Sequence, residues 1–108
     1  MGNESLYDII LPLAIADVYT YRTPSIPLQG GRDVIGCRVL VPLGKKSIIG
    51  IIYRKHEGEL PASVKVRDVL QIVDETPIVT AEQLKLWEWL SSYYMRTLGE
   101  VMVAALPS

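Results

Sequence analysis

The spacing of apolar residues changes once along this chain, and that change limits what the chain can fold into. Before residue 75, short runs alternate apolar and polar residues with the period of two that is typical of strands. After residue 79, the apolar residues follow helical spacing. This order predicts an α+β fold, in which a small antiparallel β-sheet or partly open β-barrel precedes one or two C-terminal helices. The strand-like runs are residues 7–11, 18–22, 36–41, 47–54 and 64–74.

The helical part, residues 80–106, begins with a clear start signal. Thr80-Ala-Glu-Gln83 has the form of a capping box, in which two side chains satisfy each other's backbone N–H groups. Thr97-Leu-Gly-Glu100 has the same form and predicts a second short helix. We expect Trp87 and Trp89 of the first helix to pack in the core; the alternative is that this helix presents a surface to a partner.

Length and composition indicate one globular domain over residues 1–108, with a β-rich part at residues 6–75. Hydrophobic residues make up 49% of the chain and charged residues 21%, which excludes a disordered tail. The single cysteine excludes an internal disulfide framework and a multi-cysteine zinc site. No apolar run approaches the ~18 residues of a membrane span, and the N-terminus lacks a basic leader. We therefore expect a cytoplasmic protein.

The net charge of −1 argues at first against a nucleic-acid partner, but the charges are unevenly placed. The helical end carries more acids than cations, whereas residues 38–56 contain no acid. A local basic stretch matters more for anion binding than the total charge does. The cations of this stretch are Arg38, Lys45, Lys46, Arg54 and Lys55.

The common sequence motifs of catalytic and nucleotide-binding sites are missing from the sequence. It contains no phosphate-binding loop, dinucleotide fingerprint or nucleophile elbow. His56 lies in a polar run without an obvious partner, so we expect a solvated loop residue. Cys37 lies on the apolar face of a strand pattern, where cysteine behaves as a small hydrophobe. The residues predict a protein that is not an enzyme and carries no metal or cofactor of its own.

The turn at residues 42–46 is the first candidate binding element. Gly44 would let a ligand approach the backbone, and Lys45 and Lys46 follow it directly, which suits a phosphate or a chain end. The alternative is an ordinary hairpin with a solvated tip.

The second candidate element is the Val18-Tyr-Thr-Tyr-Arg22 strand. Side chains two apart in a strand point the same way, so Tyr19 and Tyr21 share one face and Thr20 lies on the other. Exposed tyrosines could stack nucleic-acid bases at roughly 1–3 kcal/mol per base. The alternative is that both tyrosines belong to the core.

Several of these motifs occur together, in the same order, in a known family. The strand and turn Gly36-Cys-Arg-Val-Leu-Val-Pro-Leu-Gly-Lys45 precede Tyr93-Tyr94, then Leu98-Gly-Glu100 and finally Ala104-Ala-Leu-Pro107. With these motifs the chain resembles the N-terminal domain of the PriA family of primosomal replication-restart helicases.

The resemblance implies a DNA-binding domain, cut from the N-terminus of a larger bacterial helicase. Such a domain captures the 3′-terminal nucleotide of the nascent leading strand at a stalled fork and orients the motor. ATP, magnesium and zinc are then expected only in helicase regions outside this chain. Implied partners are DNA, the helicase core and, through the full-length protein, primosome and single-strand-binding proteins, at the nucleoid in the cytoplasm.

The resemblance also implies the site residues. The family's aromatic–acid–aromatic triplet falls on Tyr19, Thr20 and Tyr21, with threonine in place of the acid, so base preference stays open. The turn glycine that meets the terminal ribose falls on Gly44. A basic residue before the last strand falls on Arg67, whose fork geometry suits phosphate. Lys45 and Lys46 would support the phosphate contacts. A β-barrel module that binds protein through the Trp-rich helix is the alternative.

Overall fold

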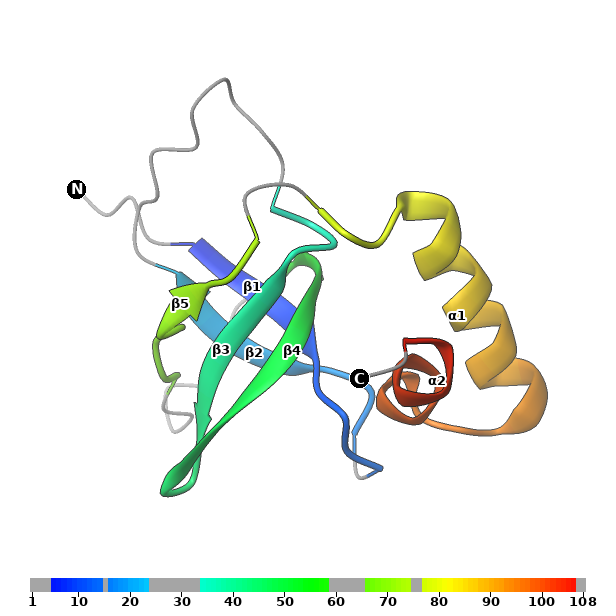
Figure 1. Ribbon diagram of the computed structural model, residues 1–108, viewed down its shortest axis with the longest axis horizontal. Helices are drawn as coiled ribbons and strands as arrows, with labels where there is room; N and C mark the ends of the chain where they lie inside the picture. Colours follow the sequence, from blue (N-terminus) through cyan, green and yellow to red (C-terminus); the bar gives the residue numbers. More distant parts are fainter. Residues whose placement is uncertain (1–4, 15, 24–33, 59–65, 75–76, 107–108) are drawn as a thin grey trace.

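The computed structural model describes residues 5–14, 16–23, 34–58, 66–74 and 77–106. Within these residues a five-stranded sheet precedes two helices (Figure 1), which confirms the predicted α+β fold. The elements are β1 (Ser5–Ile10), β2 (Tyr19–Thr23), β3 (Arg38–Leu43), β4 (Lys46–Lys55), β5 (Gln71–Ile72), α1 (Ala81–Tyr94) and α2 (Leu98–Ala105).

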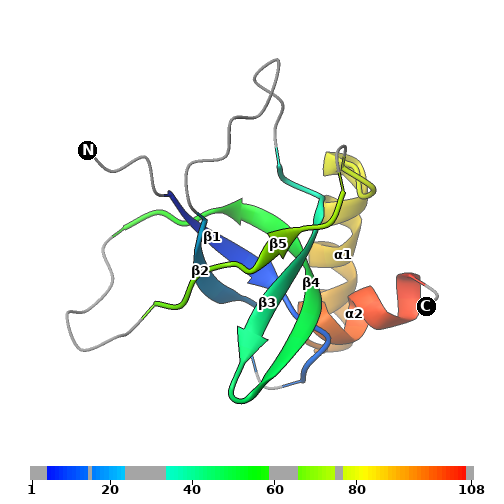
Figure 2. The same ribbon diagram turned by 60° about the vertical axis from the view of Figure 1, so that its left-hand side comes forward.

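The sheet has the strand order β2-β1-β4-β3-β5, and all neighbours are antiparallel. It curls into a half-barrel, which can be followed in Figure 2. A parallel bridge between Arg22 of β2 and Asp68, just before β5, joins the two edges of the sheet. Here the Arg22 N–H donates to the Arg67 carbonyl at 3.0 Å, and the Val69 N–H donates to the Arg22 carbonyl at 2.8 Å.

The last strand is much shorter than the predicted run over residues 64–74, whose first two residues lie outside the described part of the chain. Only Gln71 and Ile72 join the ladder with β3. The segment changes its partner from β2 to β3, because the Leu70 N–H donates to the Leu40 carbonyl at 2.8 Å. This crossing breaks the predicted alternation, so Val69 is buried and Leu70 is exposed.

Two apolar clusters form the core, and β1 contributes to both. Adjacent residues of a strand point to opposite faces. Ile9 therefore lies in the cluster inside the barrel, and Ile10 in the cluster between the sheet and the helices. Trp87 is buried in that second cluster as expected, but the prediction for Trp89 is wrong, because 56% of its surface is exposed. Trp89 lies two residues further along α1 and so on another face of the helix.

Both predicted capping boxes are present, at Thr80 with Gln83 and at Thr97 with Glu100. The second also ties α2 to the chain before β2. The Thr97 hydroxyl donates to the Leu13 carbonyl at 3.0 Å, and the Leu98 N–H donates to Asp17 Oδ1 at 3.1 Å. The start of α2 thus anchors the segment that leads into the tyrosine-bearing strand.

Gly99 permits this close approach, and we predict that Gly99→Ala destabilises the domain. A Cβ at this position would overlap the Leu11 carbonyl and lie 2.6 Å from the Leu13 carbonyl oxygen. Alanine favours a helix by roughly 1 kcal/mol over glycine. Overpacking against backbone costs about 1–3 kcal/mol or more, so the clash outweighs the helix preference. Urea unfolding measures the change, and an unchanged or raised midpoint would contradict the prediction. Ala104→Gly, on the exposed part of α2, is the control for helix propensity.

Candidate nucleic-acid interface

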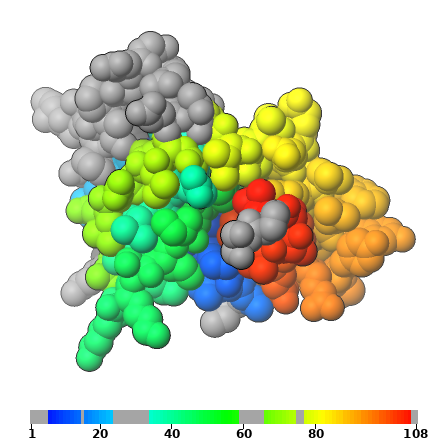
Figure 3. All heavy atoms as spheres, viewed as in Figure 1, coloured from blue at the N-terminus to red at the C-terminus, as the bar shows by residue number. Residues whose placement is uncertain are grey.

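The β3–β4 hairpin forms the most projecting part of the candidate site (Figures 1 and 3). Its last cross-strand pair joins Leu43 and Lys46, so the turn itself consists of Gly44 and Lys45. Gly44 has φ +62° at the first central position, as a type II′ turn requires. The turn is shorter than the predicted one, because Pro42 is a buried residue of β3.

Tyr21 and Arg67 both reach this hairpin from other parts of the fold. The Tyr21 hydroxyl donates to the Pro42 carbonyl at 2.7 Å, and Arg67 Nη1 donates to the Gly44 carbonyl at 3.0 Å. Burial raises the pKa of the Tyr21 hydroxyl, while the nearby positive charge of Arg67 opposes that rise. The structure therefore brings three of the predicted site residues together, namely Tyr21, Gly44 and Arg67.

The two tyrosines of β2 differ in accessibility. Tyr21 belongs to the core inside the barrel and is only 5% exposed, so its ring is closed to a stacking base. Tyr19 packs against the same cluster but is partly exposed. Of the two predicted stacking residues, only Tyr19 thus has ring surface to offer.

Thr20 faces away from this group. Its Oγ1 donates to Asp8 Oδ1 at 2.8 Å, and Asp8 is the cross-strand partner of Thr20 on β1. No described side-chain contact links Thr20 with Gly44 or Arg67. The structure therefore places the Thr20 side chain on the other face of the strand.

Asp8 is the centre of a polar cluster that our sequence reasoning missed. Asp8 is 3% exposed. Its carboxylate accepts from Thr20 and from Arg54 Nε at 2.8 Å, and the His56 Nδ1 also lies at 2.8 Å. The expectation of a solvated His56 is thus wrong. The Asp8 carboxyl in the apolar run Tyr7–Leu11 was the available signal, because a charge inside such a run requires a partner.

Burial acts to raise the pKa of Asp8, but the hydrogen bonds from Arg54, Thr20 and His56 together hold it below its ordinary value. The carboxylate is therefore ionised at neutral pH. A cleft of about 350 Å³ lies over this cluster.

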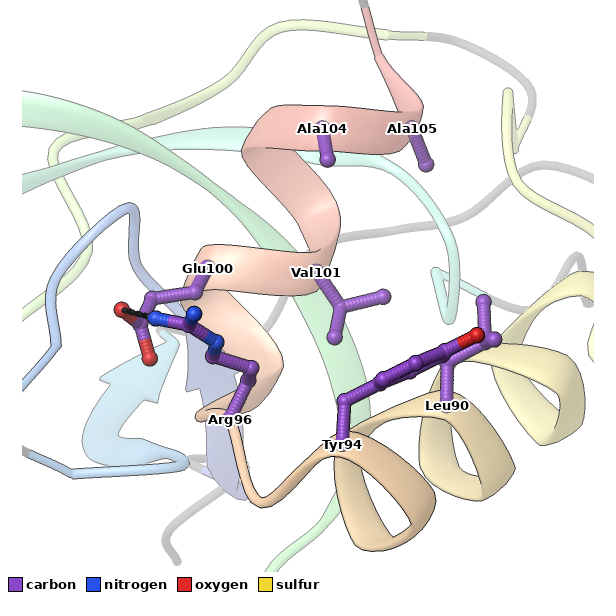
Figure 4. Close-up of a pocket in the computed structure, with 7 residues that line it drawn as sticks. All are labelled: Leu90, Tyr94, Arg96, Glu100, Val101, Ala104 and Ala105. Carbon is purple, nitrogen blue, oxygen red and sulfur yellow. Dashed lines mark ion pairs between the residues drawn. The ribbon is translucent and has the colours of Figure 1, made fainter.

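A second exposed surface lies on α1, away from the hairpin. Trp89 and Tyr93 stack with ring centroids 5.0 Å apart, and Tyr94 meets Tyr93 edge-on at 4.8 Å. Beside them, Tyr94 and Leu90 of α1 face Val101 and two alanines of α2 across a groove of about 560 Å³ (Figure 4).

Two further findings concern possible metal sites and membrane-spanning helices among the described residues. Within them, no group of three or more His, Cys, Asp or Glu is placed to hold a metal ion. The helices that the structure describes are too short or too polar to cross a membrane.

Comparison with known proteins assigns a family to this arrangement. Residues 8–107 match the family model described as the 3′ DNA-binding domain (3′BD) of PriA. The chain is 37% identical over 100 residues to the replication restart protein PriA of Rickettsia felis, and 34% identical over 103 residues to that of Rickettsia conorii. The PriA of Haemophilus influenzae is 30% identical over 101 residues. Each alignment covers 92% of this chain but only 13–14% of the relative.

We predict that Asp8 contributes to the acid sensitivity of the fold. A carboxyl whose folded pKa lies below its unfolded value stabilises the protein above about pH 4, and this contribution is lost as the pH falls through the folded pKa. Asp8→Asn should lower the unfolding free energy at pH 7 by about 1–3 kcal/mol and flatten its decline below about pH 4.

Urea unfolding between pH 7 and pH 2 measures this dependence. Asp68→Asn is the control, because it removes a carboxylate whose side chain is 67% exposed. If Asp8→Asn kept the wild-type dependence of unfolding free energy on pH, Asp8 would not contribute to the acid sensitivity of the fold.

Proposed function

This chain belongs to the family of the PriA 3′ DNA-binding domain, and from that membership we propose that it captures the 3′-hydroxyl end of the nascent leading strand at stalled replication forks. In this role it would orient a replication-restart helicase on the fork. The observation that best supports the proposal is the contact of Arg67 with Gly44, which holds a cation beside an open backbone turn.

The hairpin turn suits the sugar of a terminal nucleotide. Gly44 is exposed, and a Cβ built on it would meet no atom within 4 Å, so a ribose can approach the backbone closely. A 3′-phosphate or a continuing strand would collide with that backbone. The turn would therefore select chain ends and reject internal nucleotides.

Arg67 suits the phosphate next to the terminal nucleotide. The guanidinium has five N–H donors, and the bond to the Gly44 carbonyl uses Nη1, so other donors can meet a phosphate. The exposed Lys45 and Lys46 at the hairpin tip add charge for neighbouring phosphates. Two or three phosphate contacts on a single strand give a shallow salt slope, about −1.4 to −2.

The tyrosine strand would form the base-binding side of the site. Tyr19 offers a partly exposed ring for stacking. Tyr21 supports the hairpin, because its hydroxyl donates to the Pro42 carbonyl. Thr20 would contribute to the site indirectly, by holding β2 against β1, because its hydroxyl donates to Asp8.

The wider setting follows from the resemblance to the family and is part of the proposal. This chain spans about a seventh of the PriA proteins that it matches. A helicase core, ATP, magnesium and zinc would belong to other regions of such a protein. Primosome and single-strand-binding proteins would be its partners at the nucleoid of a bacterial cytoplasm.

We predict that the domain binds a short single strand with a 3′-hydroxyl more tightly than the same strand with a 3′-phosphate. The reason is the collision of an added phosphate with the Gly44 backbone. Fluorescence anisotropy at low salt measures both affinities, and a 5′-phosphorylated strand controls for the added charge. Equal affinity for the two 3′ ends would refute end recognition.

We also predict that Arg67→Ala weakens binding roughly tenfold or more, since it removes a charged hydrogen bond to phosphate. The salt slope should become shallower by about 0.7 for the lost contact. Lys85→Ala, an exposed cation on α1, is the matched control and should bind as the wild type does. If Arg67→Ala bound the strand with wild-type affinity, Arg67 would not be part of the binding site.

A protein-binding role of α1 is the second candidate function, favoured by the exposed Trp89, Tyr93 and Tyr94. Aromatic residues are enriched in protein interfaces and rarely gather on free surfaces. NMR shift mapping with a 3′-hydroxyl dinucleotide separates the two candidates. Shifts at residues 19–21, 44 and 67 favour the DNA role, whereas silence there favours protein binding.

A further inference from the structure

The segment that carries Arg67 is attached to β2 at Arg22. The backbone of Arg22 bonds to Arg67 on one side and to Val69 on the other. Its side chain adds two contacts, because Nη2 donates to the Val66 carbonyl at 3.1 Å and Nε lies 3.0 Å from Asp68 Oδ1. Arg22 therefore holds residues on both sides of Arg67.

Of these side-chain contacts, the ion pair with Asp68 contributes little to stability. The Asp68 side chain is 67% exposed and that of Arg22 is 36% exposed, and an ion pair of this kind adds about 0–1 kcal/mol. The backbone bridge would persist without them. Their consequence is therefore mainly geometric, since they fix the direction in which residues 66–68 leave the bridge.

That direction determines where the Arg67 side chain can reach. Arg67 lies between the two residues that the Arg22 side chain contacts, and its guanidinium extends to the Gly44 carbonyl of the hairpin. We propose that Arg22 is a positioning residue for the 3′-end site, whose side chain holds Arg67 beside Gly44 so that it meets the DNA phosphate. This inference rests on the proposed DNA-end function.

In this proposal Arg22 acts by positioning Arg67 and does not itself contact DNA. Its guanidinium is directed at Asp68 and Val66, on the segment before β5. Arg67 by contrast is directed at the hairpin tip with Lys45 and Lys46. A positioning role and a direct phosphate contact therefore predict different behaviour when both arginines are changed.

A double-mutant cycle tests the proposal. Arg22→Met keeps the apolar stem and the backbone bridge and removes the side-chain contacts to Val66 and Asp68. Its affinity for a 3′-hydroxyl single strand is measured by anisotropy over a salt series, alone and together with Arg67→Ala. Arg38→Met is the control, because it also removes an arginine from an ion pair, at the end of β3 that is far from the hairpin. Thermal unfolding checks that each variant is folded, and Arg22→Gln enters the same cycle if Arg22→Met is not.

We expect Arg22→Met to weaken binding about threefold to tenfold and to make the salt slope shallower, because part of a charged hydrogen bond is lost. In the Arg67→Ala background it should have no further effect. Arg38→Met should bind as the wild type does. Additive losses in the double variant, or wild-type affinity and slope of Arg22→Met, would overturn the inference. Wild-type affinity of Arg67→Ala would instead refute the proposed site itself.

Discussion

One short piece of backbone, residues 67–70, joins both edges of the curled sheet. On one side its groups bond to Arg22 of β2, and on the other the Leu70 N–H bonds to Leu40 of β3. Open strand edges are available for unwanted pairing with other chains, and a segment that pairs on both sides protects them. Because the same segment carries Arg67, closing the sheet also places a cation beside Gly44.

The features that the sequence predicted correctly depend on near neighbours in the chain. Thr80 and Thr97 cap helices through residues three positions on, and Gly44 allows the backbone of a two-residue turn. The alternation of apolar residues likewise located β1 to β4 to within a few residues. Such signals fix which elements form and where they begin.

The features that the sequence did not reveal depend on contacts between distant segments. The last strand is short because its segment pairs first with β2 and then with β3, and alternation carries no information about partners. His56 meets Asp8 across β1 and β4, 48 positions apart in the chain. Trp89 is exposed because the sheet covers only the face of α1 that carries Trp87. The opposite orientation of Thr20 and its two tyrosine neighbours, by contrast, follows from the alternation of the strand and was predicted from the sequence.

The two candidate surfaces lie on different sides of the molecule and differ in charge. The hairpin with Lys45 and Lys46 projects away from the helices (Figure 1), whereas the aromatic surface on α1 lies in the acid-rich end of the chain. The lysines of the first surface would attract a nucleic acid, and the acids near the second would repel it, over distances of about one Debye length, roughly 10 Å. The near-zero net charge then reflects two opposed regions, and a DNA end on the hairpin would leave α1 free for a protein.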